Sequence, residues 1–310
     1  MHPDQAPSLP ASRRCGPAPG RGRTLLLVGC GDVGLRVLRL LRGRWRTIVL
    51  TSSPGRLEAL RAAGALPLVG DLDDPRTLGR LGALADTVLH LAPPPSRGTE
   101  DPRTAALLRA LARGGRVQRL VYASTTGVYG DCGGQWIDET RTPRPQTDRA
   151  RRRVDAEARA RHFGRQTGCA VTVLRVPGIY GLDRSGGDPR ERVRRGAPVL
   201  RAKDDVFTNH IHADDLARAC VRALCAGRPQ RVVNACDDTD LPMGDYYDLV
   251  ADLWGLPRPP RLPREAIHAA VGEAAASFMG ESRRIRNARL KRELGLRLRY
   301  PTVREGLAPG

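Results

Sequence analysis

Three glycines near the start of the chain have a spacing that could bind a pyrophosphate. Gly29, Gly31 and Gly34 form the pattern Gly-x-Gly-x-x-Gly in the segment VGCGDVG. The first glycine permits a tight turn, the second lets a pyrophosphate approach the backbone, and the third lets a helix pack closely on a strand. A helix N-terminus behind this loop would favour the negative charge, so the pattern predicts dinucleotide binding.

The segment VLTSSPGR carries a second candidate group, because it offers Ser52 and Arg56 and no acidic residue before Glu58. An acidic side chain here would accept a hydrogen bond from a ribose 2′-hydroxyl, whereas hydroxyls and a guanidinium suit a 2′-phosphate. The sequence therefore favours NADP(H) over NAD(H). A solvent-facing helix residue is the other interpretation of Arg56.

The third candidate group is a cluster of arginines in the segment PQTDRARRRVDAE, residues 145–157. The cluster consists of Arg149, Arg151, Arg152 and Arg153. A nucleic-acid patch would interleave aromatic residues for stacking, and here three acidic residues interrupt the charge instead. The pattern argues against nucleic acid and leaves a solvated helix face or a catalytic helix, and we expect Arg151 and Arg152 to be solvated.

The residues that would position these groups alternate regularly between apolar runs and helical patterns. Apolar runs without polar alternation are typical of buried parallel strands, and helical patterns separate them. The predicted strands are residues 24–31, 46–50, 65–72, 86–92, 117–124 and 169–176. The predicted fold is therefore α/β, with a Rossmann-type doubly wound parallel sheet.

Beyond Pro177 the alternation becomes irregular, which predicts a smaller C-terminal substrate lobe. Residues 187–198 and 257–265 are expected to be loop-rich. Helical patterns cover residues 213–227, 244–255 and 282–295. We therefore divide the chain into a disordered leader (1–23), an NAD(P)-binding domain (24–177) and a smaller lobe (178–310).

The composition of the 310 residues indicates in which cellular compartment the protein is expected. The net charge is +19, but all except two of the 52 basic residues are arginines, as in GC-rich coding sequences. The seven cysteines show no metal-ligand spacing, which predicts reduced thiols and a cytoplasmic protein. No apolar run approaches the ~18 residues that a membrane span needs.

Further segments align, in order, with a known pattern: GDLDD (70–74), LHLAPP (89–94), YASTTGVYG (122–130), LRVPGIYG (174–181) and HIHADDLARA (210–219). With the glycine loop, they resemble the extended short-chain dehydrogenase/reductase superfamily, which includes NAD-dependent epimerases and dehydratases. The C-terminal residues and the glycine spacing resemble an atypical, YeeZ-like branch of NAD(P)-dependent oxidoreductases. The resemblance covers roughly residues 24–308.

The resemblance implies cofactor contacts at the ends of the predicted strands. Besides the glycines, these positions are Asp32, Val33, Asp71, Leu72, Leu91, Ala92, Pro93, Pro177, Gly178 and Ile179. Asp71 and Leu72 would contact the adenine. Thr125 falls where the superfamily has a serine or threonine that positions a substrate oxygen.

The superfamily's catalytic tyrosine and lysine lie four residues apart on one helix, and a glutamate usually follows four residues later. Alignment on Glu157 puts Arg153 at the lysine position and Arg149 at the tyrosine position. Arg153 could still donate to the nicotinamide ribose, but Arg149 stays protonated and cannot act as acid or base. Tyr129 is the first candidate for a replacement acid, ahead of Tyr180 and Asp148.

The segment IHADD raises the question of a metal site. His210 and His212 have no third ligand nearby in the sequence, so we predict no metal. Asp214 is expected to cap the following helix.

These features together predict an oxidoreductase that acts on a carbonyl or alcohol of the aldehyde or ketone class without the usual tyrosine. A catalytically silent NADP(H)-binding sensor or scaffold is the alternative. Epimerase or dehydratase chemistry on a nucleotide sugar is less supported, because it normally relies on the missing tyrosine. The expected partner is a small-molecule substrate. We expect a monomer or weak homodimer, because like charges on the arginine helix would oppose pairing.

Overall fold

The computed structural model describes residues 23–309, so the predicted leader lies outside the described residues except for Arg23. A seven-stranded sheet forms the larger lobe, with all its strands parallel and in the order β3-β2-β1-β4-β5-β7-β12. The strands are β1 (Thr24–Val28), β2 (Arg46–Thr51), β3 (Leu66–Val69), β4 (Thr87–His90), β5 (Arg119–Thr125), β7 (Ala170–Val176) and β12 (Arg231–Asn234). The predicted doubly wound sheet is confirmed, with its topological switch point between β1 and β4.

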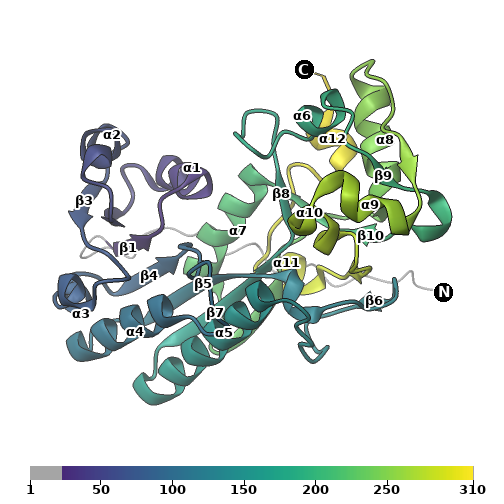
Figure 1. Cartoon of the computed structure of the whole chain (residues 1–310). Helices are drawn as coiled ribbons and strands as arrows, with labels where there is room; N and C mark the ends of the chain where they lie inside the picture. The colour runs from purple at the N-terminus through teal and green to yellow at the C-terminus, as the bar shows by residue number, and fades with distance from the viewer. Residues whose placement is uncertain (1–22, 310) are drawn as a thin grey trace, which may run out of the picture.

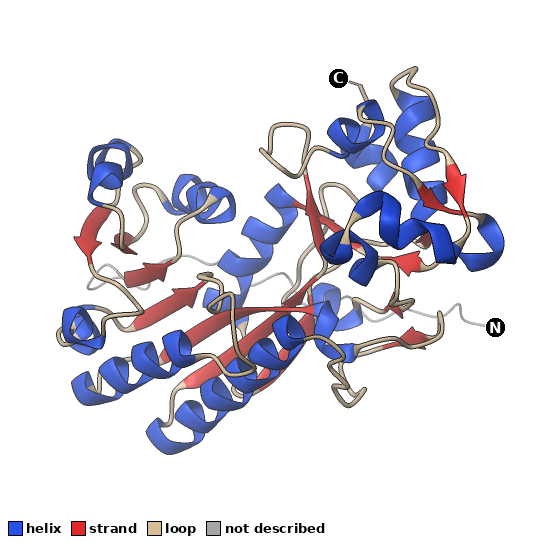
Figure 2. Ribbon diagram, viewed as in Figure 1, coloured by secondary structure: helices blue, strands red, loops and turns tan. Residues whose placement is uncertain are grey.

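Helices cover both faces of this sheet (Figures 1 and 2). They are α1 (Asp32–Leu41), α2 (Leu57–Ala62), α3 (Leu81–Leu84), α4 (Pro102–Gly114), α5 (Asp148–Thr167) and α7 (Ala213–Ala226). Alternate strand residues point to opposite faces, so Leu25 and Leu27 pack under α1 and α7 while Leu26 and Val28 pack with α3 and α4. The strands are apolar on both faces because both faces are covered.

The smaller lobe lies at the upper right of Figure 1 and combines short helices with two-stranded pairs. Its helices are α6 (Pro189–Arg194), α8 (Met243–Leu253), α9 (Arg264–Val271), α10 (Glu273–Phe278) and α12 (Val303–Leu307). The paired strands are β8 (Gly178–Tyr180) with β11 (His210–His212), β9 (Val199–Leu200) with β14 (Arg261–Leu262), and β10 (Phe207–Thr208) with β13 (Leu241–Pro242). A fourth pair, β6 (Trp136–Ile137) with β15 (Arg284–Ile285), precedes α11 (Ala288–Arg292).

Three sequence predictions need correction at this level. Residues 187–198, expected as loop, contain α6, because Asp188 caps a helix whose first residue is Pro189. The helix expected over 282–295 is reduced to α11, since residues 284–285 pair with β6 instead. The chain also returns to the large sheet after the predicted boundary at residue 177, through α7 and β12.

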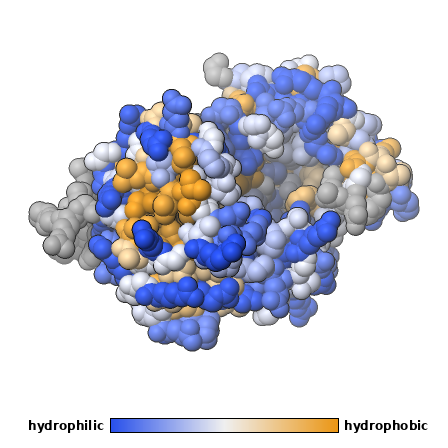
Figure 3. All heavy atoms as spheres, turned by 60° about the vertical axis from the view of Figure 1, so that its left-hand side comes forward, coloured by the Kyte–Doolittle hydropathy of each residue, from blue (hydrophilic) through white to orange (hydrophobic). Residues whose placement is uncertain are grey.

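The surface on the side of β3 is partly apolar, and Figure 3 turns this side forward. Leu66 and Val69 of this edge strand are exposed by 48% and 49%.

Within residues 23–309 there is no helix long and apolar enough to span a membrane. Five cysteines of this part of the chain are unpaired and buried: Cys30, Cys132, Cys169, Cys220 and Cys236.

Candidate functional site

The three glycines of the loop after β1 have three different surroundings, as the motif requires. Gly29 has φ +87°, and a Cβ there would lie 2.3 Å from the backbone nitrogen of Ala92. A Cβ on Gly34 would lie 3.3 Å from the carbonyl oxygen of Gly29, where α1 packs on the loop. A Cβ on Gly31, the N-cap of α1, would meet no atom within 4 Å. The open side at Gly31 therefore leaves space for a pyrophosphate at the helix N-terminus.

The carboxylate of Asp32, a predicted cofactor contact, is bonded to other side chains. Arg36, one turn further along α1, donates to it with Nε 3.1 Å from Oδ2, and Arg184 Nε lies 3.4 Å away. Arg36 is 4% exposed and also binds Asp183 at 2.7 Å and Asp214 at 2.5 Å. Arg36 neutralises the acid at the N-terminus of α1 and joins the glycine loop to the second lobe.

Arg56 lies beside the glycine loop, where its Nη2 donates to the carbonyl oxygen of Cys30 at 2.7 Å. It is half-buried, so the interpretation as a solvent-facing helix residue is wrong. Ser52, at the end of β2, is exposed. A hydroxyl and a guanidinium therefore lie at the end of β2 next to the loop, where the adenosine ribose of a dinucleotide binds in this fold.

The other residues expected to contact the cofactor lie either against the glycine loop or in turns and core contacts beside it. Leu91 and Ala92 follow β4 and press against Gly29. Asp71 accepts a hydrogen bond from the backbone of Asp73 at 2.9 Å, and Leu72 packs on the core under the sheet. Val33 packs on the opposite core cluster, next to α1. The structure brings these residues to the carboxyl edge of the sheet around the loop.

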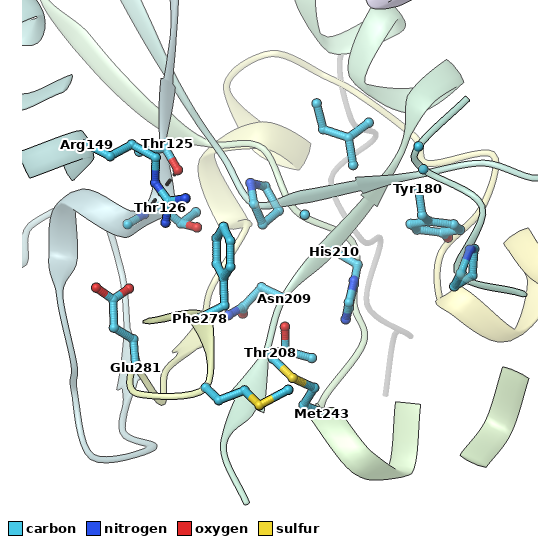
Figure 4. A pocket seen from close by; sticks show the side chains of 18 of the residues that line it. Thr125, Thr126, Arg149, Tyr180, Thr208, Asn209, His210, Met243, Phe278 and Glu281 are labelled. Carbon is cyan, nitrogen blue, oxygen red and sulfur yellow. Dashed lines mark hydrogen bonds between the residues drawn. The ribbon is translucent and has the colours of Figure 1, made fainter. Parts of the chain in front are cut away.

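A cavity of about 840 Å³ lies between the carboxyl end of β5 and the smaller lobe. Figure 3 shows the surface hollowed between the two lobes, and Figure 4 shows the side chains inside. Predicted site residues that line it are Pro93, Thr125, Arg153, Pro177, Gly178 and Ile179. The cavity therefore brings the expected nicotinamide end of the site together with the second lobe.

Thr125 ends β5 and caps the short 3-10 turn Thr126–Tyr129. Its Oγ1 accepts a hydrogen bond from the backbone of Gly127 at 3.3 Å. The hydroxyl keeps its proton for a substrate oxygen, because this bond uses the oxygen only as an acceptor.

Helix α5 places Arg149 and Arg153 on the same side, four residues apart, and both line the cavity. Arg153 Nη1 donates to the Ala123 carbonyl at 2.8 Å and the Tyr122 hydroxyl at 3.1 Å, which fixes its direction. The Arg149 guanidinium lies 4.2 Å from the ring centre of Phe278, and Figure 4 shows it extending toward Thr125. Burial lowers the pKa of Arg149.

Glu157, the residue on which the alignment was anchored, fixes the middle of α5. Its carboxylate is bonded to Arg175 at 2.7 and 3.1 Å and accepts from the Ser124 hydroxyl at 2.6 Å. Glu157 and Arg175 are 4% and 3% exposed, so this is a buried ion pair between α5 and β7. The ion pair therefore ties the helix that carries Arg149 and Arg153 to the sheet.

Arg152 corrects a further prediction, because it is 7% exposed rather than solvated. Its Nη1 donates to the Gly98 carbonyl at 2.5 Å, and the residue lines the cavity. Arg151 is exposed as predicted and pairs with Asp148 at 2.7 Å. Sequence spacing could not distinguish these neighbours, since the loop over Arg152 comes from a distant segment.

Tyr129 does not line the cavity, which contradicts its predicted role as the replacement acid. The side chain is fully buried, and its hydroxyl donates to Asn234 Oδ1 at 2.7 Å. Burial raises the pKa of Tyr129 to about 12, and the Arg175 guanidinium lies 4.6 Å from its ring centre. The proximity of Tyr129 to Thr125 in sequence is misleading, because the 3-10 turn directs the two side chains apart.

The IHADD segment forms the end of β11 and the start of α7. The predicted cap, Asp214, is replaced by His212, whose Nδ1 accepts from the Asp214 backbone at 3.1 Å. Asp215 is fully buried and accepts from the backbones of Arg299 and Tyr300 at 2.8–2.9 Å. In the part of the chain that the structure describes, no cluster of histidine, cysteine and acidic residues could hold a metal.

Several residues of the cavity wall were not predicted from the sequence. They are Arg192 and Arg195 on or after α6, His210, Tyr246 and Tyr247, Phe278, Glu281 and Arg283. His210 stacks on Tyr246 with ring centres 4.1 Å apart, and burial lowers its pKa to about 3. The arginine-rich segment before residue 196 was the one available signal, and it was interpreted as loop.

Comparison with known proteins agrees with this geometry. The model of the NAD dependent epimerase/dehydratase family matches residues 26–236. The chain belongs to this family. The NAD-dependent family model and the glycine loop identify a dinucleotide site of the NAD(P) type.

Similar proteins cover most of the chain. Protein YeeZ of Escherichia coli strain K12 is 26% identical over 90% of this chain and 97% of its own length. The 2′-dehydrokanamycin reductase of Streptomyces kanamyceticus is 27% identical over 90% of this chain and 80% of its own. A solved structure of a functionally unknown conserved protein from Silicibacter pomeroyi DSS shares 34% identity, with a TM-score of 0.77 over 92% of this chain and 96% of that one. This member of the family therefore has relatives along nearly its whole length.

Proposed function

We propose that this family member is an NADP(H)-dependent oxidoreductase that interconverts a carbonyl compound and its alcohol. The observation that carries the proposal is the open backbone at Gly31, set between the close contacts of Gly29 and Gly34. The name of the reductase from Streptomyces kanamyceticus supports the same class of reaction. Kinship alone does not define a reaction, so the assignment depends on the site.

In such a reaction, some side chains around the cavity would hold the cofactor and others would orient the substrate. Arg153 is directed by Ala123 and Tyr122, and it would donate to the nicotinamide ribose through the rest of its guanidinium. Pro177 and Ile179 would flank the nicotinamide, while the Thr125 hydroxyl orients the substrate oxygen. NADPH, when bound, supplies a hydride from C4 of the nicotinamide to the carbonyl carbon.

The proton for the resulting alkoxide would come from water in the open cavity. Arg149 occupies the family's tyrosine position and stays protonated. General acid catalysis contributes roughly 10²–10⁴-fold, so turnover by positioning alone would be slow. An NADP(H)-binding sensor is the alternative, because Arg149 holds the tyrosine position and Tyr129 lies outside the cavity. Tyr180 lines the cavity, but it is buried and its hydroxyl donates to the Thr302 carbonyl at 3.4 Å.

Preference for NADP(H) rests on Ser52 and Arg56. The 2′-phosphate would add a charge-assisted contact to Arg56, which is held at the loop by the Cys30 carbonyl. Hydrogen bonds to charged groups contribute about 1.5–3 kcal/mol, so we expect Arg56→Gln to weaken NADPH binding about 10- to 100-fold and leave NADH binding unchanged. Arg61→Gln, an exposed change on α2, is the matched control.

The first test is a calorimetric titration of the protein with NADPH and, separately, NADH. Tight binding of NADPH and weak binding of NADH supports the cofactor assignment, and failure of both to bind refutes it. Loss of NADPH absorbance with a panel of aldehydes and ketones then separates enzyme from sensor. Binding without consumption of NADPH for any member of the panel would favour the sensor.

A further inference from the structure

The cavity wall carries a large excess of positive charge. The lining residues include seven arginines and three acids: Arg149, Arg152, Arg153, Arg184, Arg192, Arg195, Arg283, Asp188, Glu191 and Glu281. Two of the acids are already bonded, Asp188 to Arg190 at 2.7 Å and Glu281 to Arg283 at 2.6 Å. Low-dielectric walls of one sign focus a field on whatever enters, and here that field attracts anions.

The arginines of the wall differ from the buried arginines elsewhere in the protein. Arg36 and Arg175 each bind carboxylates that offset their burial. By contrast, five arginines of the wall have no carboxylate within ion-pair distance among the side chains that the structure describes: Arg149, Arg152, Arg153, Arg192 and Arg195. A guanidinium that faces a cavity without a carboxylate is available for an external anion.

Three of these arginines line the cavity from the two lobes. Arg149 lies in the first turn of α5 on the larger lobe, and Arg192 and Arg195 come from the end of α6 on the smaller lobe. Aromatic rings steady two of them: Phe278 lies 4.2 Å from Arg149, and Tyr247 lies 5.1 Å from Arg192. Arg192 is further held by the Pro198 carbonyl at 2.9 Å. Stacking covers the faces of the guanidinium groups and leaves the N–H edges for hydrogen bonds.

The anion is a different one from the cofactor phosphates. In the proposed function the pyrophosphate lies at Gly31 and the 2′-phosphate at Arg56, after the carboxyl ends of β1 and β2. Neither Gly31 nor Arg56 lines the cavity. Arg153 is committed to the ribose in the proposed function. Arg149, Arg192 and Arg195 therefore have no cofactor phosphate assigned to them.

We propose that Arg149, Arg192 and Arg195 bind an oxyanion group of the substrate, a carboxylate or a phosphate, so that the substrate class is anionic carbonyl compounds. The proposal rests on the proposed function and specifies its substrate. Because Arg149 extends toward Thr125 in Figure 4, the anionic group and the carbonyl that Thr125 orients lie at the same end of the cavity. The replacement of the family's tyrosine by Arg149 then exchanges an acid for a substrate-binding cation.

The test is calorimetric titration of the protein saturated with NADP⁺, using two matched pairs of probes. Pyruvate is compared with its uncharged ester ethyl pyruvate, and dihydroxyacetone phosphate with dihydroxyacetone. We expect at least one anion to bind, the uncharged partners to bind at least tenfold more weakly, and added sodium chloride to weaken the anion. The first pair reports a carboxylate and the second a phosphate.

Variants then locate the binding group. Arg149→Gln and Arg192→Gln should each weaken the anion about 10- to 100-fold, the range for a lost hydrogen bond to a charged group. Arg151→Gln is the matched control, because Arg151 lies on the same helix, is exposed and pairs with Asp148. Unchanged melting temperatures show that the variants fold.

Two results would overturn the inference: neither anion binds the NADP⁺ complex better than its uncharged partner, or Arg149→Gln and Arg192→Gln bind it as well as wild type. If NADP⁺ itself does not bind, the proposed function is wrong instead. The same anion titrations on the cofactor-free protein then decide this inference separately.

Discussion

The glycine loop after β1 and the N-terminal turns of α5 serve the same crevice, but they are shaped by different kinds of contact. At the loop, the decisive distances join backbone atoms, such as the Ala92 nitrogen against Gly29. On α5 they join long charged side chains to carbonyls, rings and acids. At Gly29 the backbone contacts accept only glycine, whereas a side-chain wall can carry arginine in place of tyrosine or lysine without changing the fold. The loop is therefore shaped by its backbone, and the wall on α5 by its side chains.

The strongest test of this contrast removes the anchor of α5. Glu157→Ala leaves the Arg175 guanidinium buried without a carboxylate, and such a loss typically costs 3–5 kcal/mol. We expect the free energy of unfolding, measured in urea, to fall by about that amount. Glu58→Ala, an exposed change on α2, should alter it by less than about 0.5 kcal/mol. A small effect of Glu157→Ala would mean that α5 is held by packing rather than by this pair.

The glycine loop is tested at Gly31, where the packing of the fold leaves room for a side chain. Gly31→Val adds a side chain where a Cβ meets no protein atom, so the melting temperature should stay within about 2 °C. The same side chain fills the space for the pyrophosphate, and NADPH affinity should fall about 100-fold or about 2.7 kcal/mol. Gly79→Val, also free of neighbours within 4 Å but distant from the loop, is the control. Unchanged affinity in Gly31→Val would contradict the assignment of the loop.

A further experiment measures how the free energy of unfolding depends on pH through His210 of the cavity wall. Burial holds the pKa of His210 at about 3, below its usual 6.5, so the folded protein keeps the ring neutral while the unfolded chain takes up a proton. Stability from this group is full above pH 6.5 and is lost as the pH falls toward 3. Between pH 7 and 5 the loss is about 2 kcal/mol. His210→Gln should have a correspondingly shallower dependence of unfolding free energy on pH, and parallel curves for the two proteins would exclude His210 as the cause.

The sequence predicted the backbone part of the site and missed much of the side-chain part, and there is a physical reason for the division. Gly29, Gly31 and Gly34 are local in sequence, and apolar runs identify buried strands without knowledge of their neighbours. The interpretation of Tyr129 failed because its partner, Asn234, comes from a strand 105 residues later. Arg152 and Arg192 were missed for the same reason, since their burial depends on segments far away in the chain. Long-range contacts leave no local pattern.

Arg36 has a consequence for how ligands enter. One guanidinium is bonded to Asp32 on the glycine loop, to Asp183 in the loop before α6, and to Asp214 at the start of α7. The start of α1 behind the glycine loop and the wall of the cavity are thereby joined by this guanidinium, in addition to the ion pair between Arg184 and Asp32. A movement that separates these segments has to break the three ion pairs of Arg36 together, so we expect the first turn of α1 and the segment before α6 to move as one unit.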